Sequence, residues 1–218
     1  MDSSPEPQME RVFGLERLIF FSDAVFAIAI TLLAIELRVP EIVETANDAI
    51  ASQTLWLAIA AEWPRLLAFA LSFYIIGAFW IAHHRYFRYI KSYDEGLIRL
   101  NLVWLFFVVL LSFTTAILGE YGNLQIAIVL YALNLICAGL AGEALWYHAT
   151  HARRLVDAAL DERFIRRLQA RTLTMLLASL IVIGLTFFID DYASFGWLLI
   201  FVFQGLVERH YRRTGTFK

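Results

Sequence analysis

The feature that most constrains this chain is a long apolar stretch, residues 17–37, that carries a carboxylate in its interior. The stretch is about as long as the roughly 20 residues that cross a bilayer as a helix. Ser22 and Asp23 nevertheless lie within it. A carboxylate at bilayer depth costs about 2.5–3.5 kcal/mol on insertion scales. The stretch therefore predicts a membrane helix whose Asp23 has a partner within the protein.

Composition supports a membrane protein. Of the 218 residues, 60% are hydrophobic and only 17% are charged, whereas soluble domains have about a quarter charged residues. The first residues lack a basic region followed by a short apolar core, so we expect no signal peptide. The lone Cys137 is expected to act as a small buried hydrophobe. The sequence contains no phosphate-binding glycine loop, paired-cysteine zinc spacing or nucleophile elbow, so we expect neither an enzyme nor a cofactor.

Apolar segments predict an all-α integral membrane protein with six transmembrane helices per subunit. The expected helices span about 14–38, 62–90, 95–118, 122–150, 168–189 and 192–211. Together they form one domain, 14–212, between an N-terminal segment, 1–13, and a C-terminal tail, 213–218. Residues 41–61 are too short and too polar at their start to span, and they predict a surface helix or loop.

Basic residues predict the orientation of the chain. Six spans place both termini on one side, and only Arg38 and Arg65 of the 18 basic residues lie on the other. Basic loops face the cytoplasm, so we expect a multi-pass protein of the cell membrane with both termini cytoplasmic. The arginine-rich segment 151–171 is expected to meet lipid headgroups and not nucleic acid. The opposite side is acidic, which could concentrate cations or could reflect ordinary polar loops.

Helical periodicity separates two faces of the first span. Ile28, Leu32 and Ile35 share one face, because they follow the i, i+4, i+7 spacing, and Thr31 lies beside them. Ser22 and Asp23 lie away from that face. Periodicity alone leaves open whether the aliphatic face meets lipid or has another role.

Three motifs resemble one family. Arg17-x-x-x-Phe21-Ser22-Asp23 is similar to the signature of the transmembrane protein 175 family of lysosomal and bacterial potassium channels. Residues 79–87, with Trp80, His83 and His84, resemble the inner end of the family's second helix. Residues 112–121 resemble the outer end of its third helix, although Thr114 stands where the family often has proline, which predicts a straighter helix.

The resemblance implies a function and a set of roles. It implies a bacterial-type homotetramer in which the first helix of each subunit lines a central K⁺ pore. The outside of the tetramer would contact membrane lipids. Ile28 would be the constriction, Leu32 and Ile35 the next layers, and Thr31 a hydroxyl beside them. A pore ringed by aliphatic side chains would select K⁺ over Na⁺ only modestly. The implied structural network comprises Arg17, Phe21, Ser22, Asp23, Trp80, His83 and His84.

Other polar residues leave alternatives open. A secondary transporter or proton-coupled carrier could use Asp23 and Glu143, and a membrane enzyme or haem protein is a third class. His148 and His151 share a helical face and could bind a metal or be interfacial polar residues; we expect no metal. Residues 115–122 include Gly-Glu-Tyr-Gly, which we interpret as a helix end and turn and not as a carbonyl filter.

Overall fold

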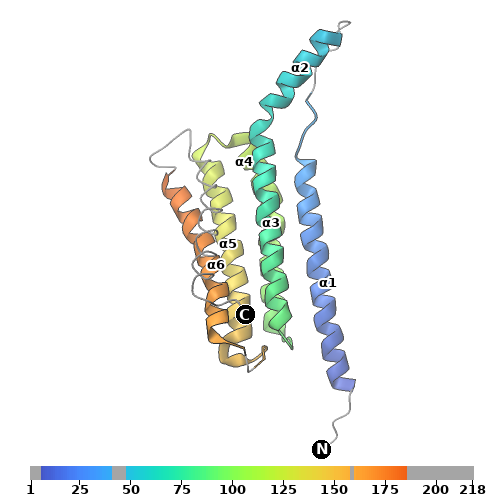
Figure 1. The fold of residues 1–218 in the computed structure, drawn as a ribbon, viewed down its shortest axis with the longest axis vertical. Coiled ribbons are helices and arrows are strands. Elements are labelled where there is room, and N and C mark those ends of the chain that lie inside the picture. The colour runs from blue at the N-terminus through green and yellow to red at the C-terminus, as the bar shows by residue number, and fades with distance from the viewer. Residues whose placement is uncertain (1–5, 41–47, 158–159, 186–218) are drawn as a thin grey trace, which may run out of the picture.

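The computed structural model describes residues 6–40, 48–157 and 160–185, and this part of the chain is helical (Figure 1). Its elements, in order, are α1 (Glu6–Ile35), α2 (Asp48–Ala61), α3 (Trp63–Tyr89), α4 (Glu95–Tyr121), α5 (Gln125–Thr150), the 3-10 turn η1 (His151–Arg153) and α6 (Glu162–Leu185).

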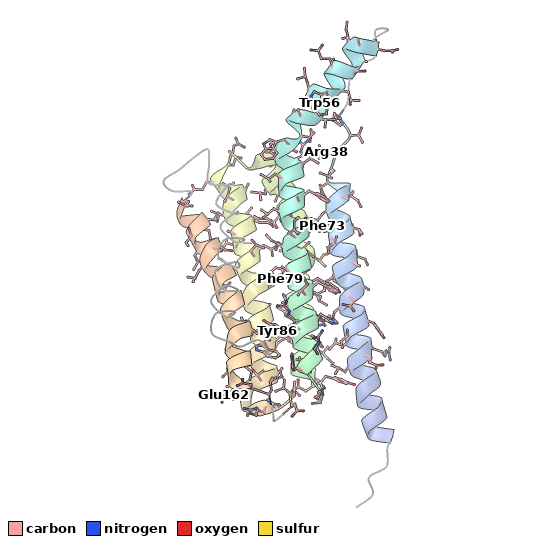
Figure 2. The ribbon with its side chains drawn as sticks, in the orientation of Figure 1. Arg38, Trp56, Phe73, Phe79, Tyr86 and Glu162 are labelled. Atoms are coloured by element: carbon pink, nitrogen blue, oxygen red, sulfur yellow. The ribbon has the colours of Figure 1, made fainter. Side chains whose placement is uncertain are left out.

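The helices form a bundle with one projecting arm. In Figure 1, α3, α5 and α6 stand side by side, α4 is largely hidden behind α3, α1 runs along the bundle, and α2 projects obliquely from the end where α3 begins. The helix α4 is central, because it packs against α1, α3 and α5, while α6 packs on α5. No residue of α2 is buried, and Trp56 lies on it away from the bundle (Figure 2). The prediction of a surface helix or loop at 41–61 is thus met over α2.

Local signals explain where the helices begin and end. Pro64 lies in the first turn of α3, where its missing N–H costs nothing. Asp94 caps α4 by accepting a hydrogen bond from the Leu97 N–H at 2.8 Å. With Thr114 in place of a proline, α4 runs unbroken from Glu95 to Tyr121. The Gly-Glu-Tyr-Gly sequence forms the end of α4 and the turn after it, as predicted.

Within the described residues, four helices are long and apolar enough to cross a membrane: Gly14–Ile35, Trp63–Tyr89, Glu95–Tyr121 and Gln125–Arg153. They match the first four predicted spans. The apolar part of α6, Leu176–Leu185, is shorter. The predicted span 192–211 lies outside the described residues, so the count of six remains a prediction. The helix α1 begins at Glu6, earlier than the predicted 14, because hydropathy marks contact with lipid and not where a helix starts.

The core between α1, α3, α4 and α5 is rich in aromatic side chains. Trp104 on α4 packs edge-on against Phe26 and Phe79, and at a tilt against Tyr86. Figure 2 labels Phe79 and Tyr86 on α3. A side chain on Gly142 of α5 would come within 2.9 Å of the Trp104 ring. The absence of a side chain there lets α5 approach α4 closely, as small residues do in membrane bundles.

Candidate functional site: the two faces of α1

One face of α1 is buried against α3 and α4. Ser22, Phe26, Ala29 and Leu33 lie on it, and each is at most 1% exposed. Their spacing of four, three and four residues is the spacing of one helical face. The Phe26 ring packs against His83 of α3 and Trp104 of α4. This face therefore fixes α1 to the bundle.

The other face of α1 is open in the subunit. Ile28 is 56% exposed, Leu32 36% and Ile35 72%. Thr31 is exposed as well, and its hydroxyl donates to the Ile28 carbonyl at 2.9 Å. The aliphatic row that periodicity placed on one face is thus partly to largely exposed in the subunit, most of all at Ile35 and Ile28.

A chain of hydrogen bonds joins the buried face to α3 and α4. The Asn101 side-chain amide on α4 donates to the Ser22 hydroxyl at 2.9 Å, and Ser22 donates to the Leu18 carbonyl at 2.8 Å. The Asn101 oxygen lies 3.0 Å from Nε2 of His83. Because an amide oxygen can only accept, His83 must carry its proton on Nε2. The chain then runs from His83 through Asn101 to Ser22 and ends on a backbone carbonyl.

Asp23 has the partner that its position demanded. The indole Nε1–H of Trp80 on α3 donates to its carboxylate at 2.9 Å. Trp80 also faces the exposed His84, with ring centres 6.0 Å apart. Arg17 and Phe21 are exposed, and Arg17 makes no ion pair with the side chains that the structure describes. Of the predicted network, the structure connects Ser22 to His83 through Asn101, and Asp23 to Trp80.

Two partners of α1 on α4 were not singled out from the sequence. One is Asn101. The other is Ser112, whose hydroxyl donates to the backbone carbonyl of Ala29 at 3.2 Å. A polar side chain inside an apolar span was the signal that drew attention to Asp23, and the same signal was present at Asn101 and Ser112.

Glu143 and His148, the other candidate polar residues, lie at separate places. Glu143 accepts a hydrogen bond from the Tyr86 hydroxyl at 3.3 Å. His148 lies 2.9 Å from the Asp94 carboxylate, which Arg154 also approaches at 3.4 Å. Burial acts to raise the pKa of Asp94, but hydrogen bonds from the Leu97 N–H and His148 outweigh it and lower that pKa below its usual value. Among the described side chains, no cluster of three or more His, Cys, Asp or Glu could hold a metal ion.

The fold and this site define an all-α membrane protein whose first helix is hydrogen-bonded to the bundle on one face and open on the other. The chain belongs to the TMEM175 family. The family model described as "Endosomal/lysosomal potassium channel TMEM175" matches residues 17–111. The matched proteins are named as channels, which confirms the expectation that the chain is not an enzyme.

Bacterial members resemble the chain over most of its length. A potassium channel of Streptomyces collinus is 36% identical over 171 residues, which are 77% of this chain and 80% of that protein. A potassium channel of Chamaesiphon minutus is 38% identical over 150 residues, 66% of this chain and 70% of that protein. The crystal structure of a lysosomal potassium-selective channel TMEM175 homologue from Chamaesiphon minutus has a TM-score of 0.73 at 27% identity, covering 89% of this chain and 98% of that one.

Proposed function

We propose that this protein is a K⁺-permeable cation channel in which α1 of each subunit of a homotetramer lines a central pore. The observation that carries the proposal is the open row of Ile28, Leu32 and Ile35 on a helix whose opposite face is bound to the bundle. Four such rows around an axis would form stacked aliphatic rings. Bacterial relatives named as potassium channels support the choice of ion.

The aliphatic rings determine the kind of selectivity. Isoleucine and leucine side chains offer no oxygen to replace lost water, so a cation must keep its hydration shell or shed part of it at a cost. K⁺ holds its water less tightly than Na⁺, so the constriction favours K⁺ modestly, and the same rings can close the pore by dewetting. The Thr31 hydroxyl donates to the Ile28 carbonyl, yet its oxygen keeps acceptor capacity that it can offer to a passing cation.

The basic residues favour a cell-membrane protein with both termini in the cytoplasm. At the predicted outer end, Arg65 of α3 pairs with Glu62 and with Glu120 of α4. Arg65 thus faces two carboxylates, and this cluster of three side chains carries a net negative charge. Labelling of cysteines placed at the ends of α3 in intact cells measures this orientation.

Substitution of Ile28 tests the constriction. Ile28→Asn places an amide on the ring and should wet or widen it, so the K⁺ over Na⁺ permeability ratio in liposomes should fall toward one. Ile28→Leu, which stays aliphatic, should keep the ratio. Ile126→Asn makes the same change at an exposed residue of α5 and should also keep it. An unchanged ratio in Ile28→Asn excludes Ile28 as the filter.

The mass of the detergent-solubilised protein tests whether it is a tetramer. Electrical recording tests whether it is a channel or a carrier. A channel gives unitary currents, whereas a carrier using Asp23 and Glu143 gives saturable coupled flux. Both carboxylates already accept hydrogen bonds from α3, from Trp80 and Tyr86.

A further inference from the structure

We propose that Ser112 of α4 is a positioning residue for the constriction. By holding the backbone of α1 at Ala29, it fixes the rotation of α1 that presents Ile28. Its effect on ion permeation rests on the proposed function, whereas its effect on the rotation of α1 does not.

The contact lies next to the constriction. The Ser112 hydroxyl donates to the Ala29 carbonyl at 3.2 Å, across 83 residues of sequence. Ala29 is fully buried and follows Ile28 directly. Its methyl side chain lets α4 approach closely enough for a serine to reach the backbone. The other hydrogen bonds to α1 from neighbouring helices that the structure describes end on Ser22 and Asp23, more than one turn away.

Rotation at this level decides what lines the open face. Successive residues of a helix differ in direction by about 100°. The residues on either side of Ile28 are Ala27 and Ala29. A rotation of α1 by about 100° about its own axis, in either direction, would therefore place an alanine where Ile28 now lies. The proposed ring of isoleucine side chains would then lose its bulk. The constriction depends on the rotational setting of α1 as well as on the identity of residue 28.

Hydrogen bonding is well suited to hold that setting. Lipid is as apolar as the helix surfaces, so helix association in a bilayer depends on packing and interhelical hydrogen bonds. The Ala29 carbonyl has two lone pairs and can accept from Ser112 as well as from its own helix. The preceding carbonyl, of Ile28, accepts the Thr31 hydroxyl. Two consecutive backbone carbonyls of α1 thus accept hydrogen bonds from side-chain hydroxyls. One hydroxyl belongs to α4, and the other lies on the open face of α1 itself.

The first experiment measures the K⁺ over Na⁺ permeability ratio from reversal potentials of the reconstituted protein. Ser112→Ala removes the donor, and the permeability ratio should fall by about threefold. This is the change in an equilibrium constant that corresponds to the loss of one average interhelical hydrogen bond. Ser72→Ala is the matched control. Ser72 is a fully buried serine whose partners, Tyr131 and Thr115, lie on α5 and α4 and not on α1. It should lower thermal stability and leave the ratio unchanged.

An isosteric pair separates the hydroxyl from side-chain volume. Ser112→Thr keeps the donor and Ser112→Val does not, although the two side chains have nearly the same shape. If Ser112→Ala does not assemble, this pair decides the question. Wild-type selectivity in the threonine variant and lowered selectivity in the valine variant support the proposal, and equal ratios overturn it.

A second readout does not depend on permeation. In a Cys137→Ser background, Leu33→Cys places a thiol on the buried face of α1, where it should react slowly with a water-soluble thiol reagent. Adding Ser112→Ala should speed the reaction, and adding Ser72→Ala should not. Unchanged reactivity overturns the positioning role. If Ile28→Asn leaves selectivity unchanged, the constriction proposal fails, while the thiol reaction still decides whether Ser112 sets the rotation of α1.

Discussion

Leu32 and Leu33 are consecutive leucines of α1 in different surroundings. Leu33 is 1% exposed and packs in the core, whereas Leu32 is 36% exposed on the open face. The same contrast divides the whole helix. The face with Leu33 also carries Ser22 and receives hydrogen bonds from α4, whereas the face with Leu32 is aliphatic apart from Thr31.

The contrast bears on the usual reading of polar residues in a membrane. An ionisable residue in a span is by default a candidate for ion binding or proton transfer. Here the side chains of Ser22 and Asp23 have hydrogen-bond partners on neighbouring helices. The face left for an ion is chemically plain. The following predictions test whether attachment and conduction divide between the two faces as proposed, from the largest expected effect to the smallest.

Asn101→Leu should give the largest loss of stability. It leaves the His83 Nε2–H without an acceptor in a fully buried site and removes the bond to Ser22. A lost hydrogen bond and an unpaired buried donor together cost about 2–4 kcal/mol. The thermal midpoint of the assembled protein, followed by size-exclusion chromatography, should fall clearly below that of Leu102→Ala, a change at the exposed neighbour. A wild-type midpoint combined with altered permeation would assign Asn101 to conduction instead.

Leu33→Ala and Leu32→Ala test the comparison with identical changes. Leu33→Ala should cost about 2–3 kcal/mol, less than the largest losses in soluble cores, because lipid is as apolar as leucine and mainly packing is lost. Its K⁺ over Na⁺ ratio should stay near wild type. Leu32→Ala should cost less stability and change conductance, because it shortens a side chain of the proposed pore. Equal effects of the two variants on both measurements would remove the distinction between the faces.

The main features of α1 and of the other long helices could be predicted from the sequence. The length of apolar runs predicted the four long apolar helices that the structure describes, and the helical period placed Ile28, Leu32 and Ile35 on one face. The cost of a carboxylate in lipid required a partner for Asp23. These inferences rest on properties of one helix or one residue, which a single sequence contains.

Contacts between helices were less accessible. Nothing in the spacing of α4 indicates that Asn101 and Ser112 face α1, because that depends on how two distant helices are rotated against each other. The indole of Trp80 was one of three possible partners for Asp23, and only the structure selected it over the Arg17 guanidinium. Likewise, hydropathy could not show that α1 extends back to Glu6.

Asp23→Ala should have a smaller effect than either change in the core. It leaves the Trp80 Nε1–H without its acceptor, but Trp80 is 41% exposed in the subunit, so this donor is less deeply enclosed than that of the fully buried His83. A hydrogen bond to a charged group is worth about 1.5–3 kcal/mol, so we expect a loss near the lower end. The assembled fraction on size exclusion should fall, and the permeability ratio of the remaining tetramer should not change. Asp23→Asn keeps an acceptor oxygen and should restore assembly. Normal assembly with altered permeation would place Asp23 on the conducting side.

Asp94, in the connection between α3 and α4, should give the smallest effect. It caps α4, while the neighbouring Tyr93 lies so close to Gly14 of α1 that a side chain there would collide with its ring. The pKa of Asp94 is lowered in the folded protein, so the unfolded chain binds its proton more tightly. The stabilisation is therefore complete above the ordinary carboxyl pKa of about 4 and is lost as the pH falls through the lowered value.

Asp94→Asn isolates the charge from the cap, since asparagine caps a helix as well as aspartate does. At neutral pH it should cost less than about 1 kcal/mol, because the Asp94 carboxylate and its partners His148 and Arg154 are partly exposed. Its thermal midpoint should decline less than that of wild type between pH 5 and pH 3. Asp94→Ala, which also removes the cap, should cost about 1 kcal/mol more at every pH. If the thermal midpoint of Asp94→Asn falls as steeply with pH as that of wild type, the acid sensitivity arises from other groups. The connection between α3 and α4 would then be stabilised by the helix cap and by packing alone.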